Sequence, residues 1–248
     1  MLNSEHKTDN NLLQLDSRSR KIQKMFSKGP QTYEQVNRTI TLGFDRRWRR
    51  KMVRQATAGA PPGNWVDMCT GTGEIAVYLQ QLAPEGTQVW GMDFTPGMLE
   101  VARSKPEAGS IRFVAADIKA LPFSENSLEL VTMSFATRNI NLDRETLVSS
   151  FAGYCRALKP GGRFVNLESS RPPIAFIRWC NDVFIKLLVK SAGSRISGTE
   201  SPYVYLARTI PRFYPAEGLA DILREAGFSK VTFKRMLFGA VAIHEAVK

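Results

Sequence analysis

The residues best suited to chemistry stand at the ends of two short apolar stretches. Asp67 precedes the turn Thr70-Gly71-Thr72-Gly73, and twenty residues after Gly73 a second apolar stretch, 88–92, ends at Asp93. Glycine lets a turn bring its backbone close to a ligand. A carboxylate after the next strand can accept both hydroxyls of a ribose. Strand, glycine turn, helix, strand and acid in this order predict a nucleoside pocket rather than an ordinary tight turn.

The spacing of the glycines narrows the choice of nucleoside. A dinucleotide fingerprint has a third glycine that lets the helix pack on the strand, and none follows Gly73 at that spacing. The acid Asp67 suits a ligand that carries an ammonium and no pyrophosphate, such as the methionine end of S-adenosylmethionine (SAM). In these residues the chain resembles the class I methyltransferases, whose usual pattern is acid-x-Gly-x-Gly-x-Gly. Cys69 occupies the first glycine position, which only a small side chain would permit.

The elements around this turn alternate as in a parallel sheet. We expect an α/β, Rossmann-like class I methyltransferase fold. Its sheet would have seven mostly parallel strands with helices on both faces, N-terminal helices and a helical insertion after the fifth strand. The expected helices cover residues 17–25, 31–41, 74–82, 96–104, 142–158 and 216–226, with one more opened by Asp45 as N-cap. The expected strands begin with one at Trp65 and continue with 88–92, 111–115, 128–134, 163–168, 231–237 and 240–246.

The chain divides into three expected parts. Residues 1–16 are expected to form a disordered tail, 17–60 an N-terminal helical cap, and 61–248 the methyltransferase domain, with a substrate-lid insertion at 169–215. Within the insertion, the mostly apolar stretch 174–190 is expected to be a helix with one narrow polar stripe. Three interpretations stay open for it: a helix packed over the core, a lid over an apolar substrate, or a helix lying in a membrane interface.

Composition sets further bounds. With 248 residues and 43% apolar content, one domain with a sizeable core is expected. Three widely spaced cysteines predict neither a disulfide framework nor a metal site, which favours an intracellular protein. The polar residues 1–24 do not resemble a signal peptide, and no apolar run is long enough to span a bilayer.

The net charge of +11 is unevenly distributed. Residues 1–60 carry +8 and 171–248 carry +6, whereas 61–170, which hold the expected nucleoside pocket, carry −3. Basic flanks favour an anionic partner, either phospholipid or nucleic acid, over a merely solvated surface.

The loop after the fourth expected strand, 134–140, indicates how the methyl acceptor is activated. It contains neither the Asn/Asp-Pro-Pro-aromatic sequence of many nitrogen methyltransferases nor the nucleophilic cysteine of the pyrimidine C5 enzymes. It does contain Arg138, and a cation there favours a phenolate, by stabilising it or by orienting a water as base. A phenolate makes its ortho carbon a nucleophile. The alternative is that Arg138 is a structural ion-pair partner.

Several motifs bring a closer resemblance. Phe135-x-x-Arg138-Asn139, the Leu158-to-Arg163 segment and Tyr203-x-Tyr205-Leu206 resemble the ubiquinone/menaquinone biosynthesis C-methyltransferase family. The matches run from about Phe26 to the C-terminus. The family resemblance implies SAM-dependent C-methylation of a polyprenylated hydroquinone in quinone biosynthesis. The alternatives are a paralogue that acts on another phenolic or prenylated molecule, an RNA methyltransferase, or a non-catalytic subunit with the same fold.

The resemblance also implies site residues. Arg138 would assist proton removal, with Asn139, Tyr203 and Tyr205 near the substrate ring. His244 matches as well, although a lone histidine on a last strand is more often structural. The expected SAM contacts are Asp67, Thr70, Gly71, Thr72, Gly73, Asp93, Phe94, Met98, Asp117, Ile118 and Ser134. Four positions depart from the family's usual residue: Glu34 for aspartate, Asp45 for histidine, Thr137 for an aliphatic residue and Val204 for arginine.

The expected partners follow from this function. They are a lipophilic quinol and, transiently, an anionic membrane surface, with no nucleic acid expected and a homodimer left open. The expected location is the cytoplasm, peripheral at the inner face of the membrane. The quinone and the length of its tail are not determined by the sequence.

Overall fold

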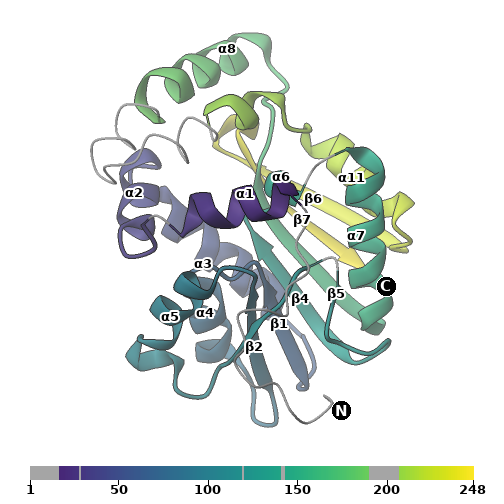
Figure 1. Ribbon diagram of the computed structural model, residues 1–248. Coiled ribbons are helices and arrows are strands. Elements are labelled where there is room, and N and C mark those ends of the chain that lie inside the picture. Colours follow the sequence, from purple (N-terminus) through teal and green to yellow (C-terminus); the bar gives the residue numbers. More distant parts are fainter. Residues whose placement is uncertain (1–16, 28, 119, 141–142, 190–206) are drawn as a thin grey trace.

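A seven-stranded sheet organises the chain (Figure 1). The computed structural model describes residues 17–27, 29–118, 120–140, 143–189 and 207–248. The strand order is β3-β2-β1-β4-β5-β7-β6, and β7 alone runs antiparallel to its neighbours. This arrangement confirms the expected fold class. The strands are β1 (Asn64–Met68), β2 (Gln88–Asp93), β3 (Arg112–Ala115), β4 (Leu128–Ser134), β5 (Leu158–Ser169), β6 (Lys230–Met236) and β7 (Val241–Val247).

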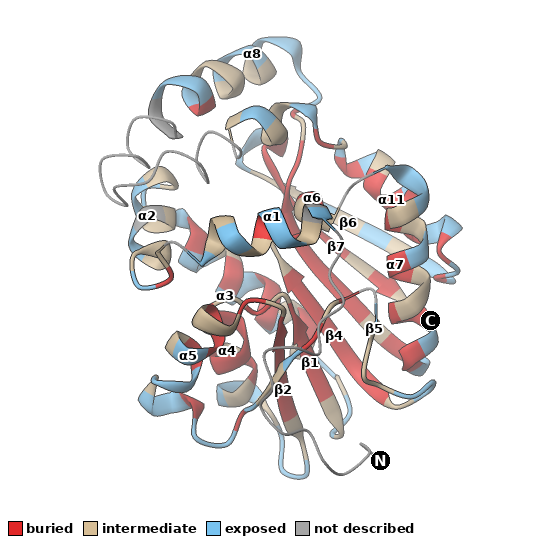
Figure 2. Ribbon diagram, in the orientation of Figure 1, coloured by how far each residue is buried: buried red, intermediate tan, exposed pale blue. Residues whose placement is uncertain are grey.

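Helices cover both faces of the sheet, which is buried along most of its length (Figure 2). Successive side chains of a strand point to opposite faces. Trp65 therefore packs in the core under α3 (Phe44–Thr57) and α4 (Glu74–Leu82), and its neighbour Val66 in the core under α7 (Arg144–Ala157) and α11 (Ala216–Glu225). The two cores fix the sheet between the helical layers, so the strand ends are rigid supports for a site.

The direction of the chain reverses between β1 and β4. From β1 the chain runs outward through β2 and β3, and then returns to place β4 on the other side of β1. In open α/β sheets, ligands bind beyond the carboxyl ends of the strands at such a switch point. Three elements bear on this end: α5 (Pro96–Arg103) after β2, the short α6 (Thr137–Ile140) after β4, and the N-terminal α1 (Ser17–Phe26).

Most expected boundaries agree with the structure within two residues. α7 is among them and begins at Arg144, because Asp143 is its N-cap and accepts a 2.7 Å hydrogen bond from the Thr146 amide. Two expectations differ. The Lys-Pro-Gly-Gly segment after α7 belongs to β5, since Leu158 already pairs with Leu128. Asp45 is not an N-cap: Gly43 holds that place with φ of 77°, and Asp45 lies in the first turn.

The expected insertion helix is present in part. Residues Ala175–Phe184 form α8, and Ile185–Val189 continue it as a π-helical turn, η2. α8 lies outside the two helical layers at one end of the molecule, and none of its residues is buried (Figures 1 and 2). Residues 1–16 lie outside the described part, so the expected tail is untested, as is the domain division at residue 60. Nowhere in the described ranges does a helix have the length and apolar content to cross a membrane.

Candidate active site

The glycine turn joins β1 to α4 and holds a tight backbone. The Thr70 amide donates to the carbonyl of Met92 over 2.9 Å, which ties the turn to β2. Gly71 and Gly73 have φ of 56° and 78°, values that favour glycine. A Cβ on Gly73 would lie 3.0 Å from that of Ala102. Gly73 is therefore required by both its conformation and the close approach of α5.

Cys69 stands at the position where the pattern has its first glycine, and the structure shows why glycine is usual there. Its φ is 53°, in the left-handed region. Burial raises the pKa of its thiol well above the ordinary value, and the nearby carboxylates of Asp93 and Asp67 raise it further. The raised pKa favours the neutral thiol, so Cys69 serves as a small uncharged side chain in the turn.

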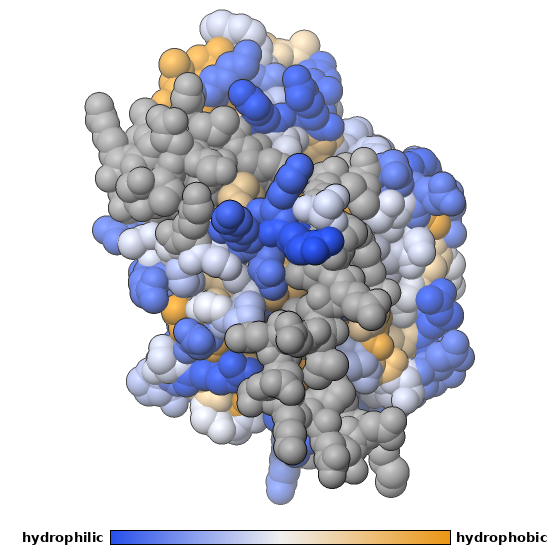
Figure 3. All heavy atoms as spheres, viewed as in Figure 1, coloured by the Kyte–Doolittle hydropathy of each residue, from blue (hydrophilic) through white to orange (hydrophobic). Residues whose placement is uncertain are grey.

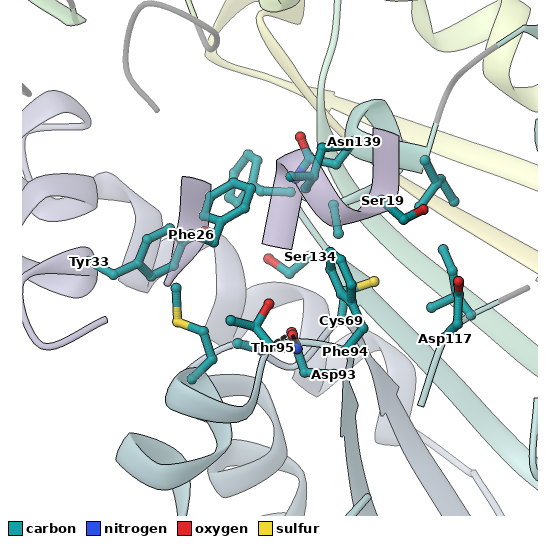
Figure 4. A pocket seen from close by; sticks show the side chains of 17 residues that line it. Ser19, Phe26, Tyr33, Cys69, Asp93, Phe94, Thr95, Asp117, Ser134 and Asn139 are labelled. Atoms are coloured by element: carbon teal, nitrogen blue, oxygen red, sulfur yellow. Dashed lines mark hydrogen bonds between the residues drawn. The ribbon is translucent and has the colours of Figure 1, made fainter. Parts of the chain in front are cut away.

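Asp93 ends β2 and lies beside the turn. Its Oδ2 accepts from the Gly71 amide over 2.9 Å, and its Oδ1 accepts from the Thr95 amide over 2.8 Å (Figure 4). Burial raises the pKa of this carboxyl, while the two amide hydrogen bonds oppose that rise. Asp93 therefore holds the glycine turn through hydrogen bonds, and its remaining lone pairs can accept hydrogen bonds from the hydroxyl groups of a ligand.

A pocket opens above the turn at the carboxyl ends of β1, β2 and β4 (Figure 4). We call it the glycine-turn pocket. Seven of the eleven expected SAM contacts line it: Gly71, Asp93, Phe94, Met98, Asp117, Ile118 and Ser134. The expected substrate-side residue Asn139 lines it too.

The other four expected contacts, Asp67, Thr70, Thr72 and Gly73, do not line this pocket. Asp67 is 1% exposed and accepts a 2.8 Å hydrogen bond from the Thr132 hydroxyl. Burial raises its pKa to about 7, although the Thr132 hydrogen bond lowers it. Asp67 thus lies behind the turn, and its role toward an ammonium stays a prediction.

The N-terminal helix α1 closes the pocket from above, which the sequence did not predict. Ser19, Ile22 and Phe26 of α1 line the pocket, and the Gln23 side-chain amide donates to the carbonyl of Phe94. In Figure 4 α1 passes over the labelled Asp93 and Ser134. The space enclosed is about 80 Å³. α1 therefore forms part of the wall of this pocket.

A second, larger hollow adjoins the first, and we call it the apolar cleft. It has a volume of about 490 Å³ and is lined mainly by apolar side chains of α3, α8, η2 and η4 (Leu237–Gly239). Its polar lining residues are few: Asn37, Thr41, Asp45, Arg49, Arg138, Ser169 and Asn181, with the phenol of Tyr33. Such a cleft suits a largely apolar ligand that a few polar groups orient.

The glycine-turn pocket and the apolar cleft share a wall. Phe26, Tyr33 and Phe135 line both. Phe135 follows β4 with φ of 54°, a conformation that is unusual for a bulky residue and is concentrated at functional sites. The next turn places Asn139 in the pocket and Arg138 in the cleft. A ligand in each hollow would meet its neighbour at the Phe135 ring.

Comparison with known proteins identifies the chain. The profile of the ubiE/COQ5 methyltransferase family matches residues 14–248. The chain belongs to the ubiE/COQ5 methyltransferase family. A demethylmenaquinone methyltransferase of Thermus thermophilus is 38% identical over 222 residues, which is 89% of this chain and 98% of that protein. The ubiquinone/menaquinone biosynthesis C-methyltransferase UbiE of Desulfotalea psychrophila is 36% identical over 228 residues, or 92% and 90%.

Solved structures share the fold. A SAM-dependent methyltransferase from Thermotoga maritima aligns with a TM-score of 0.61 at 19% identity, covering 92% of this chain and 99% of that one. A Haemonchus contortus phosphoethanolamine N-methyltransferase bound to SAM aligns with a TM-score of 0.57 at 14% identity, over 81% and 52%. Together with the family assignment, these likenesses make the chain a SAM-dependent methyltransferase of Rossmann-like fold.

The residues of the glycine-turn pocket fit SAM, the cofactor of the ubiE/COQ5 family. Within the described residues, the hydroxyl oxygen of Ser134 and the side-chain oxygen of Asn139 are buried and have no hydrogen-bond partner, and both residues line the pocket. Buried polar atoms are normally satisfied, so both atoms are suited to bind a polar ligand there. Ile118 and Phe94 supply apolar surface for a base. No group of three or more acidic, histidine or cysteine side chains in the described ranges could hold a metal.

Arg138 forms the ion pair that was one of the two alternatives for it, and its role in proton removal stays a prediction. Its Nη1 lies 2.6 Å from Oε1 of Glu168 and donates to the Ser169 hydroxyl over 2.9 Å. Glu168 is completely buried, and Arg138 is 8% exposed. Arg138 also lines the apolar cleft. Its Nε is buried and has no hydrogen-bond partner among the described residues.

The remaining expected residues divide into three kinds. Tyr203, Tyr205 and the departure Val204 lie outside the described residues. Thr137 lines neither hollow: it is buried and donates to the Asn166 side chain over 3.1 Å. His244 is 1% exposed, its Nε2 lies 2.9 Å from the carbonyl oxygen of Ala216, and burial lowers its pKa to about 4. His244 is thus placed as a structural group.

Glu34 of α2 (Tyr33–Ile40) joins the N-terminal helices to the glycine turn. Its Oε1 accepts from the Thr72 hydroxyl over 2.7 Å and from the Lys105 ammonium over 2.5 Å. Burial raises the pKa of Glu34, but the hydrogen bonds from Lys105 and Thr72 outweigh it, and the net pKa is below its ordinary value. The charged form of Glu34 is therefore stabilised in the folded protein.

Replacing Glu34 with glutamine should lower the free energy of unfolding at pH 7 by about 1 kcal/mol, because a charge-assisted hydrogen bond is lost. Since the folded pKa is depressed, the contribution is present above the unfolded pKa of about 4.3 and disappears as the pH falls through the folded pKa. Urea unfolding at pH 7 and pH 3 measures this. Glu225→Gln is the control, because its pair with Arg144 is half exposed and contributes little. An equal effect of Glu34→Gln at both pH values would contradict the assignment.

Proposed function

We propose that the chain transfers the methyl group of SAM to a ring carbon of a reduced, prenylated demethylquinol in quinone biosynthesis. The observation that carries the proposal is the shared wall: the glycine-turn pocket and the apolar cleft meet at Tyr33 and Phe135, with Arg138 facing the cleft. The relatives named as demethylmenaquinone methyltransferases support a naphthoquinol ring as the acceptor.

The chemistry needs a positioned ring and an activated oxygen. SAM supplies an electrophilic methyl group on a sulfonium. The guanidinium of Arg138 stabilises the phenolate formed when a ring hydroxyl loses its proton. The ortho carbon then forms the new C–C bond while the S–CH₃ bond breaks and its electrons stay on sulfur. Loss of the proton from that carbon restores the aromatic ring as a phenolate, and the ring oxygen regains a proton, so one proton is released overall. Holding the carbon in line with the methyl supplies about 7–11 kcal/mol of the barrier.

Aromatic side chains form a wall suited to a flat ring. Trp48 lies between Phe44 and Phe135, with ring centroids 6.0 Å and 6.4 Å away. Beyond them the cleft continues along apolar side chains of α8 and η2, among them Ile177 and Phe184. An isoprenoid tail fits this continuation, while a nucleotide would find few polar partners there.

The test offers methyl-labelled SAM with four acceptors: a demethylnaphthoquinol with an isoprenoid tail, the same ring without a tail, a simple phenol and total RNA. We expect label on both naphthoquinols, with a lower KM for the tailed one because its tail fills the cleft. Label on the phenol alone would move the function to another phenolic acceptor. Label on RNA alone would overturn the proposal.

We further propose that α8 rests on an anionic membrane surface. Its inner face lines the cleft, yet its outer face is apolar too: Phe176 and Trp179 are 70% and 63% exposed. Figure 3 shows this apolar surface over α8 next to hydrophilic residues. Apolar area beside cations such as Lys186 is the composition of an interfacial helix. The enzyme would then be peripheral at the cytoplasmic face, where quinol tails reside in the bilayer.

The double substitution Phe176→Ser and Trp179→Ser should weaken binding to anionic vesicles at least about tenfold, because each ring contributes apolar area to the interface. Activity toward a tail-free quinol in solution should stay unchanged, since neither side chain lines the cleft. Vesicle sedimentation and a steady-state assay measure the two effects. Leu82→Ser is the matched control: Leu82 is 48% exposed at the far end of α4. Equal binding by all three proteins would contradict a membrane contact through α8.

A further inference from the structure

Asp45 places a carboxylate in the apolar cleft. It lies in the first turn of α3, is 2% exposed and lines the cleft. Its Oδ1 lies 3.0 Å from the Thr41 hydroxyl oxygen, whose one proton can instead go to the carbonyl oxygen of Asn37 at 2.7 Å. A buried carboxylate that is only partly satisfied costs folding free energy. Such a group calls for a ligand that can donate a hydrogen bond.

The two cations of the cleft do not satisfy Asp45. Arg49 is held by Glu74, with Nη1 and Oε2 2.6 Å apart, and Arg138 is held in the same way by Glu168. Each arginine thus has a buried carboxylate of its own. Asp45 is the one acidic side chain among the described residues that line the cleft, and no ion pair joins it to a cation within that part of the chain.

The lining of the cleft therefore offers two different hydrogen-bonding groups. The guanidinium of Arg138 only donates hydrogen bonds, whereas the carboxylate of Asp45 only accepts them. The same lining includes the aromatic side chains of Phe44, Trp48 and Phe135. A hydroquinone carries two oxygens, of which one can accept from Arg138 and the other can donate to Asp45. The oxidised quinone has two carbonyl oxygens and no donor, so one of them would face the lone pairs of Asp45.

We propose that Asp45 makes the cleft selective for the reduced ring by accepting a hydrogen bond from the hydroxyl that is not activated for methyl transfer. This inference rests on the proposed quinol substrate and deepens it. The family resemblance implies histidine at this position, and an imidazole both donates and accepts. Because a carboxylate can only accept, Asp45 requires a hydroxyl on the ligand more strictly than a histidine at this position would. Only the reduced ring is nucleophilic, so rejecting the quinone keeps an unreactive competitor out of the site.

The experiment measures the binding of a 1,4-naphthohydroquinone with one isoprene unit, kept reduced under anaerobic conditions, and of the corresponding quinone. Both are titrated calorimetrically into the full chain saturated with S-adenosylhomocysteine. Wild type should bind the quinol at least about tenfold more tightly, because a hydrogen bond to a charged acceptor is lost in the quinone. Asp45→Asn keeps the size and the Thr41 partner, and its amide can donate to a carbonyl, so the preference should vanish or invert.

Two further variants complete the design. Asp45→His should weaken the preference, because an imidazole can donate to the quinone. Asp182→Asn removes the same charge from α8 at a residue that does not line the cleft, and it should keep the wild-type preference. Thermal unfolding checks that each variant is folded. Equal binding of both rings by wild type, failure of wild type to bind either ring, or an unchanged preference in folded Asp45→Asn and Asp45→His would overturn the role of Asp45.

Methyl transfer is assayed in parallel on the same proteins. Methylation of the quinol by wild type without any binding preference would refute the role of Asp45 and leave the proposed function intact. A preference that Asp45→Asn abolishes, with no methylation of the ring, would refute the proposed function and leave the redox selectivity.

Discussion

Replacing Arg138 with alanine should lower kcat for quinol methylation by about 10²–10³-fold while SAM binding is retained. The loss follows because a donor aimed at the developing phenolate is removed, as in other sites that stabilise an oxyanion. SAM binding should persist because Arg138 lines the apolar cleft and not the glycine-turn pocket. Single-turnover kinetics and calorimetry with S-adenosylhomocysteine measure the two effects separately.

This variant also leaves Glu168 buried without its partner, which costs about 3–5 kcal/mol of stability. The double variant Arg138→Gln with Glu168→Gln separates the two consequences, because it replaces the ion pair by neutral amides that can hydrogen-bond. We expect it to recover stability and to stay inactive. Recovery of activity together with stability would show that Arg138 is only a structural ion-pair partner.

Replacing Asp93 with alanine should raise the Kd for SAM by about 10²-fold or more. One carboxylate holds the amides of Gly71 and Thr95 and is placed to accept the hydroxyls of the ribose. Hydrogen bonds to a charged group contribute about 1.5–3 kcal/mol each, so losing two of them accounts for this factor. Calorimetry with S-adenosylhomocysteine measures it. Glu100→Ala, at an exposed site on α5, should leave the Kd unchanged. An unchanged Kd in Asp93→Ala would contradict the assignment of the pocket.

The sequence predicted the parts of the site that depend only on the order and spacing of neighbouring elements along the chain. The glycine turn follows β1 and Asp93 ends β2. Parallel strands end at one edge of the sheet, so their proximity could be inferred from the spacing alone. The sequence also predicted that position 69 permits only a small side chain. The φ of 53° at Cys69 explains why glycine is usual at this position.

The parts that the sequence did not predict depend on packing between distant segments. Nothing in the composition of α1 indicates that Ile22 covers a pocket formed by β2 and β4. The partner of Arg138 lies thirty residues further along, on β5. Asp67 has the right spacing for a ligand contact, but the strand buries it behind the turn, where it bonds to Thr132. Local spacing predicts which strand end a residue occupies, and not which side of the backbone its side chain takes.

The departures from the family pattern become informative only with the structure. Thr137 is buried against Asn166, so its polar side chain has a structural explanation. Glu34 joins α2 to the glycine turn. Asp45 alone of these three faces the cleft. Of these three positions, Asp45 is therefore the one from which a side chain could contact a substrate in the cleft.

The most direct test of the account is to identify the bond that the labelled methyl group forms. Wild-type protein is incubated anaerobically with ¹³C-methyl SAM and the prenylated demethylnaphthoquinol, and the product is examined by carbon NMR. The shared wall at Phe135 and the phenolate at Arg138 predict a methyl group on the ring carbon next to the activated oxygen. A methyl group on oxygen would contradict the account, because the cleft would then present the hydroxyl itself to the sulfonium.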